Sequence, residues 1–346
     1  MRFYTNIQQY NNVIFERYIE DGVHKQREVP YQPTLYVPTV KQSPLKTIKG
    51  ERVEPRSFNS IKEARDFIQA RDKVSNEKVY GMQQFAYAYI QEQYSKREFD
   101  VNQLNILNFD IETRSDEGFP NIQEADMEIL SIALRCNGQS YILGCGEYTP
   151  SGDDKYIKCV SEADLLHKFI DLWQALDPDI VTGWNVEMFD IPYLVNRIKR
   201  RLSTEAANQL SPWGIVKDRL IPTAQTQALG DAAEPNAKEI IGITVFDYMN
   251  LYKKFTYSQQ ESYALDYIGN AELGEKKIDY SEYGTLNELY KNDYQKFLDY
   301  NIKDVLLVER LDDKMKLIEQ ACTIAYDAGV NLIDSMTSVR MWDVII

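Results

Sequence analysis

Residues Leu104–Thr113 have the sequence LNILNFDIET, and this stretch decides the fold. Its apolar side chains fall on both faces of an extended strand and are Leu104, Ile106, Leu107, Phe109 and Ile111. A strand that is apolar on both faces is typical of the interior of a sheet that helices cover on both sides. The stretch therefore predicts an α/β fold with this strand inside the sheet.

Beyond this strand the chain alternates between strand and helix patterns. The elements expected next are strands at Ile129–Leu134, Ser140–Leu143 and Ile180–Thr182 and a helix that begins after Ser161 and stops at Asp177. Such alternation is typical of a layered α/β domain, which we place at residues 101–320. Within it, residues 203–240 are polar, turn-rich and the least ordered-looking stretch, and a long helix is expected from about Asn292 to Gln320.

Residues 1–100 predict a separate, small α+β domain. A strand pattern at Val13–Ile19 is followed by a turn and by a returning strand that reaches Tyr31. Ser60 and Glu63 have the spacing of a capping box, which predicts that a helix begins there.

The composition of the 346 residues argues against several classes of protein. No run approaches the roughly 20 apolar residues of a membrane span, and the N-terminus lacks the apolar core of a signal peptide. Four cysteines without a C-x-x-C pair and only two histidines argue against a zinc site and predict reduced thiols in a cytoplasm. The net charge of −14 argues against a general coat for nucleic acid, but an enzyme that holds nucleic acid through divalent cations stays open.

The central strand ends in two acids, Asp110 and Glu112. They are two residues apart, so both side chains project from one face of the strand. Two adjacent carboxylates at this place repel each other unless a cation or a proton relieves the repulsion. The plain alternative is a strand end with solvated acids, and the common tripeptide D-x-E favours it when taken alone.

Two further motifs carry acids on helices. Residues Thr182–Tyr193, TGWNVEMFDIPY, predict a strand, a tight turn and a helix, with Asp190 as the N-cap and Pro192 in the first turn. Tyr300 and Asp304 are i and i+4 on a predicted helix and so share one face. Each motif alone has an ordinary explanation, as a helix cap and as a surface pair.

In combination the three motifs resemble those of the DEDD exonuclease superfamily. The chain shows, in order, D-x-E on a core strand, N-x-x-x-F-D at the helix start Asn185–Asp190, and Y-x-x-x-D on a late helix. The histidine subtype of this superfamily would have a histidine at position 299. This chain has Asp299 there and Tyr300 next, so it resembles the tyrosine subtype.

Longer stretches resemble the replicative family B DNA polymerases of T-even-like bacteriophages. These stretches are Ile14–Ile19, Gly118–Pro120, Phe246–Phe255, Ser262–Ile268 and Met341–Ile346. The resemblance covers essentially the whole chain, more loosely at residues 35–60 and 203–240. It implies a ribonuclease-H-like exonuclease domain with a mixed sheet, a β-hairpin within residues 215–243, and a closing segment 321–346 that joins the N-terminal domain. The motifs D-x-x-S-L-Y-P-S and Y-x-D-T-D are absent from the sequence, so no polymerase activity is expected from this chain alone.

The resemblance also implies 3′→5′ hydrolysis of DNA at two divalent ions, Mg²⁺ or Mn²⁺, which a few carboxylates suffice to hold. Asp110, Glu112 and Asp304 would hold the first ion. Asp110 would also reach the second ion, which Asp190 serves directly or through water. The Tyr300 hydroxyl, a poor base with an ordinary pKa near about 10, would position the attacking water.

The expected substrate is the 3′ end of single-stranded or frayed DNA, because a buried two-metal pocket cannot admit a duplex end. The candidate contacts to it are Thr113, Phe119, Trp184, Asn185, Phe189, Lys253 and Lys254. The resemblance favours Phe119 as a contact, whereas stacking on bases and a place in the core compete evenly for Trp184 and Phe189. Lys253 and Lys254 also fit an ordinary solvated pair.

The sequence leaves other functions open. One alternative is a non-catalytic nucleic-acid-binding or scaffold module of a split replicative polymerase, although the four intact acids and Tyr300 argue against it. The N-terminal residues are a further candidate for binding RNA or a partner. A separate chain with palm, fingers and thumb domains is the expected partner, and the apolar end Met341–Ile346 either contacts it or fills this chain's own N-terminal domain. For a viral protein the expected location is the host cell cytoplasm.

Overall fold

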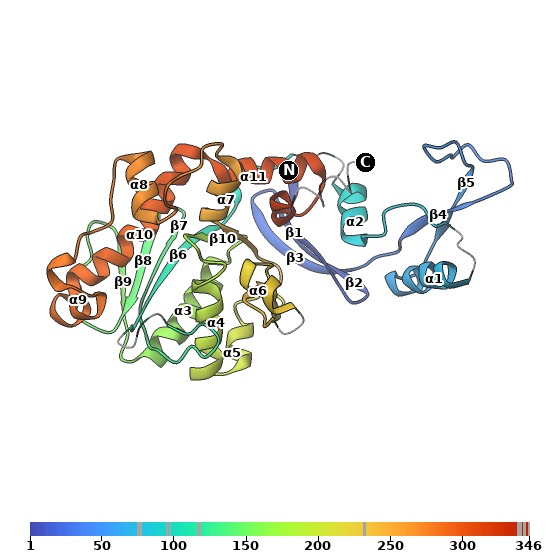
Figure 1. Cartoon of the computed structure of the whole chain (residues 1–346). Helices are drawn as coiled ribbons and strands as arrows, with labels where there is room; N and C mark the ends of the chain where they lie inside the picture. The colour runs from blue at the N-terminus through green and yellow to red at the C-terminus, as the bar shows by residue number, and fades with distance from the viewer. Residues whose placement is uncertain are drawn as a thin grey trace. The chain divides into compact units, whose positions relative to one another are not determined.

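The computed structural model describes the chain except for residues 75–77, 95, 97, 116, 117, 119, 231, 232, 338–340, 342, 343, 345 and 346. The chain forms two compact units, one of Met1–Gln103 with Cys322–Ile346 and one of Leu104–Ala321 (Figure 1). Among the described residues, no helix combines the length and the apolar character that crossing a bilayer requires.

A six-stranded mixed sheet forms the centre of the second unit, with strand order β13-β10-β6-β7-β8-β9 (Figure 1). The bounds are β6 Ile106–Thr113, β7 Ile129–Cys136, β8 Gln139–Gly144, β9 Lys155–Lys158, β10 Ile180–Gly183 and β13 Thr244–Asp247. Strand β7 is antiparallel to β6 and β8, and the other pairings are parallel. The predicted α/β fold is confirmed, and β6 lies inside the sheet with a partner on each side.

Helices cover both faces of this sheet, and the alternation of β6 divides its side chains between them (Figure 1). One face packs on α3 (Glu162–Leu176) and α4 (Asp190–Arg201), and β6 contributes Leu107, Phe109 and Ile111 to that core. Helix α10 (Tyr294–Met315) covers the opposite face, where it packs on β7 and β8. Because side chains alternate along a strand, Asp110 and Glu112 face α10.

The remaining elements of the second unit include a hairpin of β11 (Val216–Arg219) and β12 (Ala237–Ile240). The other helices are α5 Thr204–Asn208, α6 Ala224–Leu229, α7 Tyr248–Phe255, α8 Leu265–Leu273 and α9 Leu286–Asn292. Residues 203–240 are therefore more regular than their polar composition suggested. Several of those polar residues build the structure, since Ser203 and Thr223 cap the N-termini of α5 and α6.

The long helix expected from about Asn292 to Gln320 is two helices, which corrects the prediction. Helix α10 ends at Met315, and α11 (Leu317–Ala328) follows after Lys316, whose φ of 54° is left-handed. The Lys316 amide donates to the carbonyl of Asp312 at 2.7 Å, and the Asp312 carboxylate accepts from the amide of Ile318 at 3.1 Å. A left-handed residue ends a helix, and the apolar periodicity does not reveal it because it continues on both sides.

The first unit contains the antiparallel sheet β1-β2-β3 and the pair β4-β5. Its elements are β1 Arg2–Tyr10, β2 Val13–Glu20, β3 Val23–Pro30, β4 Thr34–Pro38, β5 Val53–Ser57, α1 Ile61–Val74 and α2 Phe85–Gln93. The expected strand pair up to Tyr31 and the helix after Ser60 are both present. The Tyr4 hydroxyl donates to the carbonyl of Val330 at 2.6 Å, and the Ile7 amide donates to Asn331 Oδ1 at 2.7 Å, so the closing segment packs on β1.

Candidate active site

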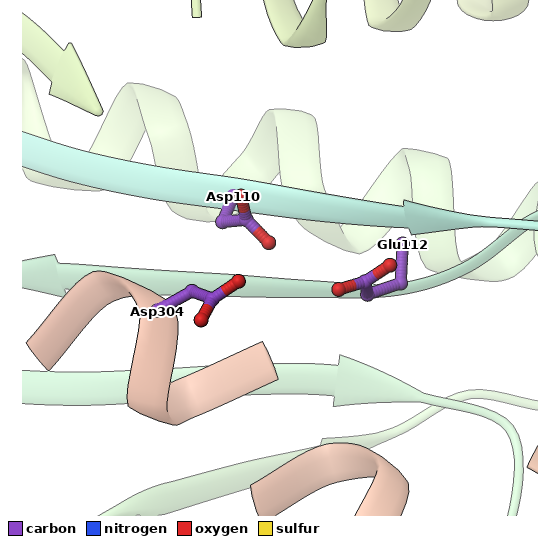
Figure 2. Close-up of side chains that lie close together, drawn as sticks. All are labelled: Asp110, Glu112 and Asp304. Atoms are coloured by element: carbon purple, nitrogen blue, oxygen red, sulfur yellow. The ribbon is translucent and has the colours of Figure 1, made fainter. Parts of the chain in front are cut away.

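Three carboxylates meet between β6 and α10. Asp110 and Glu112 come from β6 and Asp304 comes from α10, and one oxygen of each lies within 4.8 Å of the others. Figure 2 shows the three side chains pointing toward one another from the strand and the helix. Asp304 is buried, whereas Asp110 and Glu112 are partly exposed as whole residues.

A buried amide side chain holds Asp110 in place. Asn301, one turn before Asp304 on α10, donates from Nδ2 to Asp110 Oδ2 at 2.7 Å. Its own Oδ1 accepts from the Ser131 hydroxyl of β7 at 2.9 Å, which fixes the orientation of the amide. The sequence motif contained Asn301 but gave it no role. Its position on the same helix face as Asp304 was the available signal.

Asp190 begins α4 and is close enough to Asp110 for its charge to raise the pKa of that acid, but it is not one of the three carboxylates of the cluster. The expected N-cap role is wrong, because Phe189 is the N-cap and Asp190 is the first helical residue. Its Oδ1 instead accepts from the Ile111 amide of β6 at 3.1 Å. That amide is available because β10 pairs with β6 only as far as Asn108.

Tyr300 and Lys277 complete the polar surroundings of Asp304. Lys277 Nζ lies 2.5 Å from Asp304 Oδ2 and donates to the Tyr300 hydroxyl at 3.3 Å. Burial, together with the charge of Asp304, raises the pKa of Tyr300, so its hydroxyl keeps its proton at neutral pH. Lys277 was missed in the sequence because it lies on the segment between α8 and α9, and no spacing rule connects it to the acids.

Burial and mutual repulsion raise the pKa values of the site carboxyls. Burial, with the charge of Asp304, raises the pKa of Glu112 to about 8, and burial raises the pKa of Asp190 to about 7. Burial, with the charges of Asp190 and Glu112, raises the pKa of Asp110 well above its ordinary value. The pKa of Asp304 is also raised by burial, although the Lys277 ammonium opposes the shift. One lysine therefore does not neutralise the site.

The donor set fits a hard divalent cation. Mg²⁺ and Mn²⁺ prefer carboxylate oxygens, and here three carboxylates converge from rigid elements. Asp304 Oδ1 is buried and has no hydrogen-bond partner in the part of the chain that the structure describes. A buried carboxylate oxygen is costly to leave without a partner, so this orphaned atom favours a site that a cation completes.

The candidate DNA contacts lie in different surroundings. Trp184 and Phe189 are half-buried in the loop before α4, where the Trp184 indole donates to the Tyr263 carbonyl at 3.0 Å and the Phe189 ring lies 5.7 Å from that of Tyr193. Asn185 shares that loop, and Thr113 is buried at the end of β6. Lys253 and Lys254 are exposed at the end of α7. Phe119 lies outside the described residues.

A mixed sheet with clustered carboxylates on its central strand and on a covering helix defines the class of ribonuclease-H-like nuclease domains. Comparison with known proteins agrees with this assignment. The family described as DNA polymerase family B, exonuclease domain, matches residues 50–268. The chain therefore belongs to the family B DNA polymerases through their exonuclease domain.

Similarity to individual members extends further along the chain. The DNA-directed DNA polymerases of Escherichia phage RB69 and Enterobacteria phage T4 are both 31% identical over alignments that cover 99% of this chain. The DNA polymerase delta catalytic subunit of Caenorhabditis elegans is 28% identical over 66% of this chain and 22% of its own length. The chain spans 40% of the length of each phage relative.

Proposed function

We propose that this chain is a 3′→5′ exonuclease that hydrolyses the 3′-terminal phosphodiester of single-stranded or frayed DNA with two divalent ions, Mg²⁺ or Mn²⁺. The observation that carries the proposal is the convergence of Asp110, Glu112 and Asp304, with one Asp304 oxygen buried and unpartnered among the described residues. Membership of the exonuclease-domain family supports the direction of hydrolysis and the DNA substrate.

The proposed roles combine the two-ion arrangement that membership of the exonuclease-domain family suggests with the contacts of each residue. Asp110, Glu112 and Asp304 would hold one ion, and Asp110 with Asp190 would hold the other. Ions held there would supply an activated water and would neutralise charge on the phosphate and on the leaving 3′-oxygen. Asn301 orients Asp110 through its 2.7 Å hydrogen bond, which keeps the shared ligand in one rotamer. Tyr300 retains its proton and orients the attacking water, and the Lys277 ammonium beside it faces the developing negative charge.

A labelled oligonucleotide tests the proposal. With Mg²⁺ the chain should shorten a 5′-labelled single strand from its 3′ end and release nucleoside monophosphates, and EDTA should stop the reaction. A blunt duplex should be degraded more slowly than a strand with a mismatched 3′ end, because a paired end must first be unstacked. A strand that is bound but stays full-length with both Mg²⁺ and Mn²⁺ would support the non-catalytic scaffold instead.

Replacing Tyr300 by phenylalanine is expected to lower kcat by roughly 10- to 100-fold, the usual effect of losing the orientation of a reactant. Mn²⁺ affinity should stay unchanged, because the hydroxyl is not among the proposed ligands. Tyr280→Phe is the matched control, since its ring packs edge-on against Tyr300 at 5.2 Å and should leave the rate close to that of the wild type. Equal rates for the two variants would contradict the role given to the Tyr300 hydroxyl.

Replacing Lys277 by alanine is expected to lower kcat by about 10²-fold, because a charge that faces the developing negative charge is lost. Mn²⁺ binding should become no weaker, since the substitution makes the site more negative. The exposed neighbour Lys276 provides the control substitution Lys276→Ala. A loss of Mn²⁺ affinity in Lys277→Ala that accounts for the whole loss of rate would show that the lysine only organises the carboxylates.

We also propose that the chain acts together with palm, fingers and thumb domains, which a separate chain can supply, in the cytoplasm of a host cell. The two phage relatives are DNA polymerases of which this chain covers 40%, and its four cysteines are free thiols that suit a reducing compartment. The segment offered as the contact, Met341–Ile346, is described only at Met341 and Val344. Co-elution with such a partner at micromolar concentration would support the association, and separate elution would contradict it.

A further inference from the structure

The loop Trp184–Phe189, between β10 and α4, leads directly into Asp190 and carries three of the candidate DNA contacts. Its backbone is tightly constrained. Asn185 has a left-handed φ of 67°, and a Cβ at Gly183 would lie 2.5 Å from the Phe109 carbonyl of β6. Only a glycine allows the loop to start this close to the central strand.

One buried carboxylate receives the amides of this loop. Asp247, at the end of β13, is opposite Gly183 in the parallel register and is 3% exposed. Its Oδ1 accepts from the amide of Asn185 at 3.3 Å, and its Oδ2 accepts from the amide of Glu187 at 3.1 Å. Both bonds reach into the loop from a neighbouring strand, so they fix the loop relative to the sheet.

The same carboxylate also caps α7. Its Oδ1 accepts from the amides of Met249 and Asn250 at 3.0 and 3.3 Å. Capping alone would account for these two bonds, but it does not account for the bonds to Asn185 and Glu187. A neutral cap such as serine would serve α7 as well, whereas a carboxylate with two oxygens can receive amides from both directions.

The placement is electrostatically unfavourable for a purely structural residue. Asp247 is close enough to Asp190 for its charge to oppose ionisation of that acid. An additional buried negative charge near Asp190 costs free energy unless its hydrogen bonds compensate. The amides of the loop supply part of that compensation, and they would become buried donors without partners if the carboxylate were removed.

We propose that Asp247 is a positioning residue of the exonuclease site: it holds the loop Trp184–Phe189 against the sheet and thereby sets the place of Asp190. The inference rests on the proposed function, because Asp190 matters to catalysis only if it serves a metal ion. Asp247 itself touches none of the carboxylates of the cluster and acts through the loop. Loss of the anchor shifts Asp190 and the side chains that would contact the 3′-terminal nucleotide.

The test compares Asp247→Ala and Asp247→Asn with a matched control, Asp179→Asn. Asp179 is also a buried aspartate, and its Oδ2 accepts the Asn105 amide at 3.0 Å at the opposite end of β10. All proteins are folded full-length chains, assayed well below their unfolding midpoints. Three quantities are measured: kcat and KM on a single-stranded oligonucleotide, Mn²⁺ binding without DNA, and hydrogen exchange of the loop amides.

Asp247→Ala is expected to lower kcat by about 100-fold, the typical result of displacing a reacting group by about 1 Å. Asp247→Asn keeps one acceptor oxygen and should lose roughly tenfold. In both variants the Asn185 and Glu187 amides should exchange faster, and Mn²⁺ should bind more weakly. Asp179→Asn should lower the unfolding temperature about as much as the Asp247 variants do. Its kcat and the protection of its loop amides from hydrogen exchange should stay at the wild-type level.

Several outcomes would overturn the role of Asp247. They are unchanged protection of the loop amides in Asp247→Ala, a kcat equal to that of Asp179→Asn, or a loss of rate that tracks the unfolded fraction alone. A wild-type chain without nuclease activity would instead refute the proposed function. The exchange and Mn²⁺ measurements would in that case still decide whether Asp247 holds the loop.

Discussion

Asp110→Ala is expected to abolish the Mg²⁺-dependent shortening of single-stranded DNA while the protein stays folded. Asp110 is the one acid that we propose to reach both ions, and Asn301 holds it in place at 2.7 Å. Removing a single donor that stabilises a transition state costs about 10²–10³-fold in kcat. Loss of a ligand shared by two ions affects both activation of the water and neutralisation of the phosphate charge, so the loss should exceed that range.

The measurement is the single-turnover rate on a 5′-labelled oligonucleotide, with circular dichroism to confirm folding. Asp304→Ala should behave in the same way, because Asp304 of α10 supplies the buried oxygen that has no hydrogen-bond partner among the described residues. Asp313→Ala is the control, since Asp313 is an exposed acid on the same helix. Degradation by Asp110→Ala at the wild-type rate would show that the carboxylate cluster is not the active site.

The parts of this site that follow local periodicity could be predicted from the sequence. Asp110 and Glu112 share a face because strand side chains alternate, and Tyr300 and Asp304 share a face because they are one helical turn apart. The apolar residues on both faces of Leu104–Ile111 also sufficed to place β6 inside the sheet. In each case the residues concerned are only a few positions apart, so their spacing in the sequence is enough to predict which side chains share a face.

Residues brought in from distant segments could not be predicted in this way. Lys277 reaches Asp304 from the segment between α8 and α9, and Asp247 reaches the β10–α4 loop from the next strand. Nothing in their local sequence distinguishes them from a solvated lysine or an ordinary helix cap. The N-cap assignment of Asp190 was wrong for a related reason. A carboxylate at a helix start can accept hydrogen bonds from the amides of its own helix or from an amide of a neighbouring strand. Here Asp190 accepts a hydrogen bond from the Ile111 amide of β6.

The metal-free protein is expected to become less stable as the pH rises from about 5 to about 8. Burial and neighbouring charges raise the pKa of Glu112 to about 8 and burial raises that of Asp190 to about 7, both above their values in an unfolded chain. The folded state therefore binds protons that the unfolded state has released. The stability from this difference is fully present below the unfolded pKa of about 4 and is lost as pH rises through the folded pKa.

The loss between pH 5 and pH 8 should be on the order of 4–7 kcal/mol, since the folded pKa values of about 8 for Glu112 and about 7 for Asp190 lie roughly three and two units above pH 5, and each unit corresponds to about 1.4 kcal/mol. In a folded unit the size of Leu104–Ala321, such a loss lowers the unfolding midpoint by roughly 10–25 °C. Differential scanning calorimetry in EDTA measures the midpoint across this pH range for the wild type, for Glu112→Gln, and for Asp313→Asn as an exposed control. Glu112→Gln should have the flatter profile and the higher midpoint near pH 8, because it removes a carboxylate whose ionisation opposes folding.

Saturating Mn²⁺ should raise the wild-type midpoint most at high pH, where the carboxylates are deprotonated and free to bind, and should raise that of Glu112→Gln less. Repulsion among the carboxylates lowers the stability of the metal-free protein but favours the binding of cations. Glu112→Gln should therefore raise the stability of the metal-free protein and lower its activity. Parallel profiles of unfolding midpoint against pH for Glu112→Gln and the wild type in EDTA would show that groups of the protein itself neutralise Glu112. Repulsion among the carboxylates would then no longer be an argument for a bound cation.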